Sequence, residues 1–310
     1  MKFDILPFLE KYYDADEKII IACSTWADSM YLLYHLIETK YKKNIVACYL
    51  NHNTREQCKD EQAFLEDLWK KESFQVEIAD CDFEKIKQLY PNKGFEELAR
   101  DKRYQFFDAV CNIYSTNKVI TAHHLDDRIE TYMFNMLRGS KLTGLINMTE
   151  SSGWILRPLL DIQKNDIYSY LRDHSLTYFE DESNTDNSYT RNYMRNEILP
   201  HFKNVHSEHK KNLQNLFRYF EEIKFHLDSE VKEFLWEWRS FSIIMFQILS
   251  PLLQKEIIRT IYYKTNGNST IGLSEWNIAE VIKFIGGKNN MTKKEIHNMY
   301  LFKEGDSITY

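Results

Sequence analysis

The chain has 310 residues, of which 43% are hydrophobic and 28% charged, with a formal net charge of −6 and a pI near 6.0. This length predicts one or two domains with a sizeable core, and the composition is typical of a globular protein. The acidic balance argues against nucleic-acid binding over the whole surface, although it leaves room for a local basic face. No apolar run reaches the ~20 residues of a membrane helix, and the N-terminus lacks a signal-peptide pattern. We therefore expect a cytoplasmic protein without a membrane partner, and leave open whether it forms an oligomer.

Short β-branched runs alternate with amphipathic stretches through the first half of the chain. The expected elements are a short helix within 1–17, strands at 18–23, 44–50, 74–79 and 117–122, and helices at 30–39, 60–72, 94–114 and 123–137. Strands that alternate with helices pair in parallel through right-handed crossovers. The sequence therefore predicts an α/β fold with a Rossmann-like parallel sheet.

A hydroxyl-rich loop follows the first predicted strand and reads Ser24-Thr25-Trp26-Ala27-Asp28-Ser29. A predicted helix begins directly after it. Free backbone N–H groups and the helix dipole both favour an anion at such a helix start. We therefore predict a phosphate-binding loop at this position.

The helix expected at 123–137 carries His123, Asp127 and Glu130 at positions i, i+4 and i+7, which share one face. An imidazole and two carboxylates suit a ligand site better than a core, because parallel sheets bind ligands at the carboxyl ends of their strands. A divalent ion held by these side chains is a weaker alternative, since the chain offers no matching second ligand set. A solvated surface helix is the plainest alternative. Arg138 and Gly139 predict the end of the helix.

The second half of the chain is less regular. Pro158 excludes a helix interior within 154–160, a helix is expected at 164–174, and a long polar loop runs from Asp181 to Asn192. This loop is either a functional segment or a mobile surface turn.

A boundary near 200–207 predicts a first domain of residues 1–204 and a smaller, mostly helical domain of residues 205–310. The second domain is expected to contain helices from about 208 to 235, at 251–264 and at 275–285, the last with Ser274 as its N-cap. Glu304-Gly305-Asp306 predicts a hairpin turn near the end of the chain.

Five motifs occur in a fixed order after the predicted phosphate loop: GFEELARDKRY (94–104), TAHHLDDRIET (121–131), LRGS (137–140), RPLL (157–160) and EDESNTDNSYTRNYMR (180–195). With these motifs the chain resembles the tRNA(Ile)-lysidine synthases, a family of the N-type ATP pyrophosphatase (PP-loop) superfamily. The resemblance runs from the strand before Ser24 to about Pro200 and is weaker beyond. It implies a PP-loop fold for the first domain and a tRNA-contacting role for the helical domain, in the shorter architecture of the family.

The resemblance implies a ligase that joins free L-lysine to C2 of the wobble cytidine in a tRNA(Ile) with a CAU anticodon, which converts decoding from AUG to AUA. ATP would adenylate the C2 carbonyl oxygen and release pyrophosphate, and the lysine ε-amine would then expel AMP. A carbonyl oxygen leaves poorly until it becomes a phosphoester. The charge that builds on the phosphates favours N–H donors, Mg²⁺ and cations. ATP and Mg²⁺ are therefore the implied cofactors.

The resemblance also implies roles for single residues of the nucleotide site. ATP would be bound by the loop residues Ser24, Thr25, Trp26, Ala27, Asp28 and Ser29, with Asp28 as a ligand for Mg²⁺. Arg103 would neutralise the nucleotide or the activated intermediate. Asp28 and Arg103 thereby belong to the predicted catalytic set.

The other implied roles concern lysine and the tRNA. Asp127 and Glu130 would receive the amines of lysine, and a carboxylate would help to take the proton that the attacking amine loses. These two residues complete the predicted catalytic set. Arg138 and Arg195 would contact tRNA phosphate or the substrate carboxylate.

The loop departs from the family pattern Ser-Gly-Gly-x-Asp-Ser, because Thr25 and Trp26 replace both glycines. A non-glycine residue in the left-handed region costs roughly 1–2 kcal/mol, and Trp26 adds bulk where pyrophosphate would lie. A tRNA-binding pseudoenzyme of the same fold, with impaired ATP use, is therefore the alternative function. A tRNA thiolase is a weaker third hypothesis, since it would need a catalytic cysteine and Cys23 precedes the loop on the strand.

Overall fold

The computed structural model describes residues 3–51, 57–146, 148–180, 190–236 and 239–310. The chain divides into two compact units, Met1–Phe217 and Arg218–Tyr310. The domain boundary expected after residue 204 stays a prediction. Within the described residues, no helix has both the length and the apolar character that crossing a bilayer requires.

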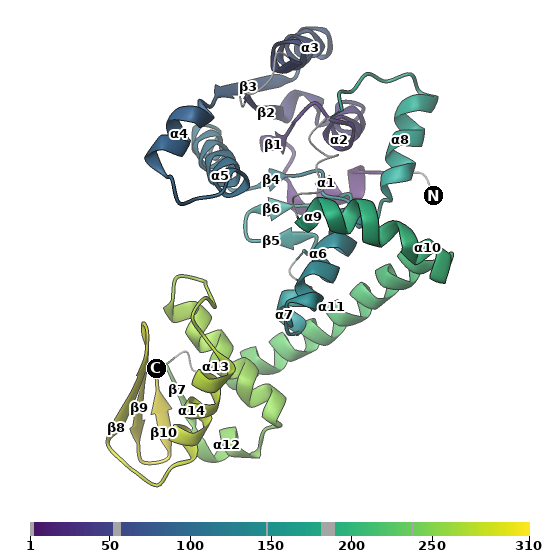
Figure 1. The fold of residues 1–310 in the computed structure, drawn as a ribbon. Helices are drawn as coiled ribbons and strands as arrows, with labels where there is room; N and C mark the ends of the chain where they lie inside the picture. Colours follow the sequence, from purple (N-terminus) through teal and green to yellow (C-terminus); the bar gives the residue numbers. More distant parts are fainter. Residues whose placement is uncertain (1–2, 52–56, 147, 181–189, 237–238) are drawn as a thin grey trace. The chain divides into compact units, whose positions relative to one another are not determined.

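The first unit is a six-stranded sheet with helices on both faces (Figure 1). Its strands are β1 (Ile19–Ala22), β2 (Ile45–Asn51), β3 (Gln75–Asp80), β4 (Val119–Ile120), β5 (Ser151–Ser152) and β6 (Ile155–Leu156). Its helices are α1 (Leu6–Tyr12), α2 (Ala27–Ile37), η1 (Lys42–Asn44), α3 (Gln57–Glu72), α4 (Phe83–Leu89), α5 (Phe95–Ile113), α6 (Leu125–Leu137), α7 (Leu142–Leu145), α8 (Lys164–Asp173), α9 (Thr190–Tyr193), the π-helix η3 (Met194–Ile198), η4 (Leu199–His201) and α10 (Phe202–Val205). The predicted α/β class is confirmed.

The order of the strands places two loops side by side. The sheet runs β3-β2-β1-β4-β6-β5 and is parallel apart from β5. Ile20 of β1 pairs with Val46 of β2 on one side and with Val119 of β4 on the other. The strand order therefore reverses between β1 and β4, and such a reversal opens a crevice at the carboxyl ends of the two strands. The residues that follow β1 and β4 meet at this crevice.

Strand β1 is buried on both faces. Ile19 and Ile21 pack in a core with side chains of α1, α2 and α8, whereas Ile20 packs in the opposite core with Phe107 and Val110 of α5. All three isoleucines are 0% exposed. This burial explains why the strand reads as a continuous β-branched run instead of an alternating one.

Three parts of the first unit differ from the sequence expectations. Helix α2 begins at Ala27 and not at residue 30, which places Asp28 in its first turn, where the helix dipole favours a carboxylate. Helix α4 was not predicted; its N-cap Asp82 accepts a hydrogen bond from the Lys85 N–H at 3.2 Å. The polar loop expected at 181–192 lies outside the described residues as far as 189, and its last residues are helical in α9.

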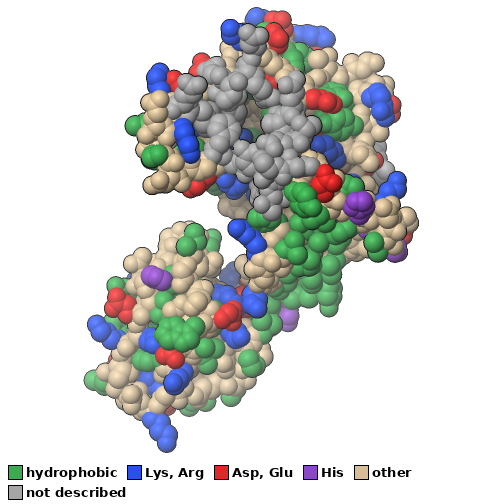
Figure 2. Space-filling view, viewed as in Figure 1, with side chains coloured by type: hydrophobic (Ala, Val, Ile, Leu, Met, Phe, Trp, Pro, Cys, Tyr) green, Lys and Arg blue, Asp and Glu red, His purple; other side chains and the backbone are tan. Residues whose placement is uncertain are grey.

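The second unit combines helices with a small antiparallel sheet (Figure 1). Its helices are the end of α11 (His209–Phe234), α12 (Ile243–Ile248), α13 (Pro251–Thr265) and α14 (Glu275–Gly286), and its strands are β7 (Ser240–Ser242), β8 (Thr292–Ile296), β9 (Met299–Glu304) and β10 (Ser307–Thr309). The predicted cap at Ser274 and the hairpin turn, with Gly305 at a φ of +57°, are confirmed. The other two strands of the sheet were not predicted. On the face drawn in Figure 2, the Lys and Arg side chains of the second unit are interspersed with Asp and Glu side chains.

Candidate active site

The loop between β1 and α2 is tied together by its own hydroxyl groups. The Ser29 Oγ accepts a hydrogen bond from the Ser24 N–H at 3.1 Å, lies 3.2 Å from the Ser24 Oγ and donates to the Trp26 carbonyl at 3.0 Å. These contacts curl the loop over the start of α2. Ser24, Trp26, Asp28 and Ser29 all line one cavity of about 240 Å³.

Thr25 has the backbone conformation that the glycine pattern predicts, at a φ of +64°. This strained conformation is stabilised by a hydrogen bond from the Phe179 N–H to the Thr25 carbonyl at 3.0 Å. Trp26, by contrast, is extended, with φ −77° and ψ 163°. The expected backbone strain therefore exists at Thr25 and not at Trp26. Trp26 affects the loop through the volume of its ring.

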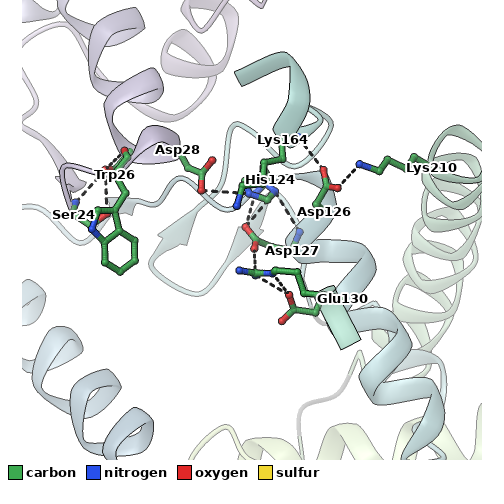
Figure 3. A network of polar contacts seen from close by, with 11 residues as sticks. Ser24, Trp26, Asp28, His124, Asp126, Asp127, Glu130, Lys164 and Lys210 are labelled. Carbon is green, nitrogen blue, oxygen red and sulfur yellow. Dashed lines mark hydrogen bonds and ion pairs between the residues drawn. The ribbon is translucent and has the colours of Figure 1, made fainter. Parts of the chain in front are cut away.

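The start of α6 links the phosphate loop to the predicted carboxylates. His124 caps the helix: its Nδ1 accepts a hydrogen bond from the Asp127 N–H at 3.3 Å, and the Asp127 Oδ2 accepts one from the His124 N–H at 3.0 Å. On its other side, the His124 Nε2 lies 3.4 Å from the Asp28 Oδ2. Figure 3 shows Asp28, His124 and Asp127 pointing toward one another. His124 was not among the predicted site residues.

His124 is 2% exposed, yet its pKa is raised. Burial lowers the pKa of its imidazole, but the carboxylates of Asp127 and Asp28 outweigh burial, and the net shift is upward. The neighbouring His123 behaves oppositely, because burial lowers its pKa to about 4. The pKa values of two adjacent histidines after β4 are therefore shifted in opposite directions.

Asp127 and Glu130 are brought together as predicted, but around a protein side chain. The Arg195 Nη2 lies 3.1 Å from the Asp127 Oδ1 and 2.7 Å from the Glu130 Oε2, and the Arg195 Nε donates to the same Glu130 oxygen at 2.9 Å. Glu130 is 5% exposed. Burial lowers the pKa of Arg195, and the two carboxylates raise it further than that. This pair of acids is therefore built to hold a cation.

The other predicted residues are distributed between the cavity and the far end of α6. Arg103 and His123 line the cavity together with Asp127. Helix α6 begins after His123, so the i, i+4 spacing does not place this residue on the helix. Arg138 is exposed at the C-cap of α6, ~16 Å along the helix from Asp127, and it stacks on Phe134. Its predicted contact with substrate stays a prediction.

Two alternatives from the sequence receive no support from this geometry. Among the described residues, no group of three or more His, Cys, Asp or Glu side chains is placed to hold a metal. Burial raises the pKa of Cys23 to about 11, so its thiol stays protonated at neutral pH, contrary to what a catalytic cysteine requires.

Comparison with known proteins fits this geometry. The PP-loop domain model matches residues 2–202. The chain belongs to the PP-loop family. This membership confirms the superfamily inferred from the motifs, and ATP use is the shared property that it implies.

Relatives of this PP-loop chain include a tRNA(Ile)-lysidine synthase and a bifunctional protein. The chain is 33% identical over 236 residues to the tRNA(Ile)-lysidine synthase of Staphylococcus aureus, an alignment that covers 74% of this chain and 54% of that protein. It is 32% identical over 311 residues to the bifunctional protein TilS/HprT of Listeria monocytogenes, covering 97% of this chain and 43% of that protein. The chain thus spans about half the length of the relatives that it matches.

A solved structure with the same fold is the U34-tRNA thiolase NcsA of Methanococcus maripaludis. The TM-score is 0.54 at 17% sequence identity, and the superposition covers 68% of this chain and 72% of the thiolase. Similarity at this level of identity supports the PP-loop fold alone.

Proposed function

We propose that this protein joins lysine to C2 of the wobble cytidine in a tRNA(Ile) with a CAU anticodon, at the expense of ATP. The observation that carries the proposal is a single cavity whose lining includes both the phosphate loop and Asp127, the partner of Glu130 around one cation. A reaction in which an amine is bound as a cation, deprotonated and then added to an activated carbonyl carbon needs these two parts next to each other. The similarity to tRNA(Ile)-lysidine synthases supports the same reaction.

In the adenylation step, ATP would be bound by the loop Ser24–Ser29, which includes Asp28, and by Arg103. Backbone N–H groups at the start of α2 would hold the phosphates, and the Arg103 guanidinium would neutralise charge as the adenylate forms. Arg103 lines the same cavity, so its charge lies within reach of a nucleotide bound there.

Asp28 fits a ligand for Mg²⁺. Its Oδ2 faces His124, whereas its Oδ1 is buried and has no hydrogen-bond partner among the described residues. A buried carboxylate oxygen without a partner is costly, and Mg²⁺ in nucleotide sites binds through one or two carboxylates plus phosphate oxygens. When bound, the ion would withdraw charge from the phosphates.

In the second step, Asp127 and Glu130 would bind the amine of lysine. Because Arg195 already satisfies both carboxylates, an ammonium group of lysine has to displace this guanidinium or share the acids with it. Asp127 also hydrogen-bonds to the His124 backbone, which fixes its orientation. Because an ammonium nitrogen has no lone pair, one of the two acids would take a proton from it, and the free amine would then attack C2 and expel AMP.

The proposal is tested by incorporation of labelled lysine. Given ATP, Mg²⁺ and the CAU-anticodon tRNA(Ile), the protein is expected to make lysine acid-precipitable, and a C-to-U change at the wobble position is expected to abolish the signal. If wild-type protein incorporates nothing but still shifts the tRNA in a binding assay, the pseudoenzyme alternative is correct. The strained Thr25 and the ring of Trp26 are the observations that favour this alternative.

Replacing Trp26 with glycine is expected to tighten ATP binding. The ring of Trp26 lines a cavity of about 240 Å³, below the ~300–1,000 Å³ usual for ligand sites. Thr25→Gly is expected to change affinity little, because Thr25 already has the left-handed conformation that glycine allows. Calorimetric titration with ATP separates the two variants. Tighter binding in Thr25→Gly alone would mean that backbone strain, not volume, limits the nucleotide.

A further inference from the structure

Three arginines gather at one side of the candidate active site. Arg100 and Arg103 lie one turn apart on α5, and both line the cavity. Arg157 follows β6 and is 9% exposed. Burial and the charge of Arg100 lower the pKa of both Arg103 and Arg157, so Arg100 acts electrostatically on each of the other two.

The cluster lacks a carboxylate partner within the part of the chain whose side chains are described. The Arg157 Nη1 donates to the Thr149 carbonyl at 3.0 Å, but its Nε is buried without a partner. The Arg100 Nη2 reaches only the Tyr104 hydroxyl, at 3.4 Å. Arg100 and Arg103 are exposed, whereas Arg157 is buried and keeps an unpartnered Nε. A buried guanidinium without a counter-charge is unfavourable, so an anion that binds at Arg157 best explains this arrangement.

Aromatic rings lie among these cations. The guanidinium carbon of Arg100 lies 5.0 Å from the centre of the Tyr104 ring, and the centres of the Tyr104 and Trp154 rings are 5.7 Å apart. Both rings are only partly buried. Cations alone would serve any phosphate, whereas cations interleaved with aromatic faces suit a single-stranded nucleic acid, whose bases stack while its phosphates are neutralised.

We propose that Arg100, Arg157 and Tyr104 form a surface that binds single-stranded RNA beside the base to be modified; we call it the arginine–tyrosine surface. This inference rests on the proposed function, because it names where the RNA substrate contacts the site. It also separates two phosphate sites: the loop Ser24–Ser29 serves the nucleotide, and the arginine–tyrosine surface serves the RNA backbone. An acidic chain can thereby bind RNA through one local patch.

The test measures RNA binding by the full chain. Fluorescence anisotropy of a labelled CAU-anticodon stem-loop is recorded at several salt concentrations. Arg100→Gln and Arg157→Gln are each expected to weaken binding about 10-fold and to reduce the slope of log K against log[salt] by about 0.7. Tyr104→Leu is expected to weaken binding by a similar factor without changing the slope, because stacking releases no counterions. Lys102→Gln is the matched control: it removes one charge from the same helix, where its Nζ contacts only Gln105 in the described structure.

The same variants are titrated with ATP. Arg157 is not among the residues that line the nucleotide cavity, so Arg157→Gln is expected to keep the wild-type ATP affinity, and the two variants at lining residues are expected to lose less affinity for ATP than for RNA. The proposal is wrong if the arginine variants bind RNA as well as Lys102→Gln does, if they lose ATP and keep RNA, or if wild type does not bind the stem-loop. Thermal melting checks each variant, and if Arg157→Gln unfolds, Arg100→Gln and Tyr104→Leu decide alone. RNA binding needs no turnover, so a wild type that binds RNA but incorporates no lysine would reject the proposed function and leave this inference standing.

Discussion

Replacing Asp28 with asparagine is expected to lower the rate of lysine incorporation by about 100-fold or more, since one preorganised charge contact in an active site contributes this much. Asparagine keeps the shape of the side chain but loses the charge that the buried Oδ1 would offer to Mg²⁺. The fold is expected to survive, because Asp28 contributes one contact of 3.4 Å with His124. Initial rates at several Mg²⁺ concentrations, with melting curves for both proteins, measure the effect.

Glu38→Gln is the matched control for Asp28→Asn. It removes a carboxylate from the other end of α2, where Glu38 is the exposed C-cap, and is expected to keep the wild-type rate. An Asp28→Asn variant that works within a few-fold of wild type, with the same dependence on Mg²⁺, would show that another group holds the metal.

Local sequence signals predicted the framework of the site. The β-branched run at Ile19–Ala22 and the loop after it follow from burial on both faces and from a helix start, both of which depend on neighbouring residues. The carboxylates Asp127 and Glu130 share a face of α6 for the same reason. The switch between β1 and β4 then brings the loop and these acids together.

The features that sequence reasoning missed depend on contacts between distant segments. Arg195 lies 65 residues after Glu130, and no local pattern indicates that it returns to this carboxylate. Arg157 belongs to the RPLL motif, but its burial near Arg100 depends on the packing of β6 against α5. The N-cap role of His124 was not predicted, because His-x-x-Asp differs from the Ser/Thr-x-x-Glu/Gln signature of a capping box.

The small sheet of the second unit was missed because its propensities are weak. Strand β8 reads Thr-Lys-Lys-Glu-Ile, and Lys and Glu are depleted in strands. The strand forms because β9 pairs with it along its length, from Thr292 opposite Lys303 to Ile296 opposite Met299. Lys303 faces inward and donates its ammonium group to the Ile285 carbonyl at the end of α14, so a residue that reads as exposed is buried. Tertiary pairing overrides propensity in this sheet.

Replacing Arg195 with methionine is expected to destabilise the protein by about 3–5 kcal/mol, because it leaves Asp127 and Glu130 close together without their shared cation. Free lysine is expected to restore part of this loss, by up to ~2.7 kcal/mol at a concentration 100 times its Kd, since its ammonium group takes the vacated position. The recovery is expected to exceed that of wild type, where lysine competes with the guanidinium. Thermal melting with and without lysine measures both effects.

Lys210→Met is the matched control, because Lys210 pairs with Asp126 on the same helix but away from the acid pair. The loss is expected to be smaller, since Asp126 keeps its hydrogen bond from the Lys164 N–H at 2.9 Å and both partners are about a quarter exposed. Lysine should not restore it. A lysine effect that is present in wild type and absent in Arg195→Met would instead make Arg195 the group that binds the substrate carboxylate, and the acid pair would then orient this arginine rather than receive the amine.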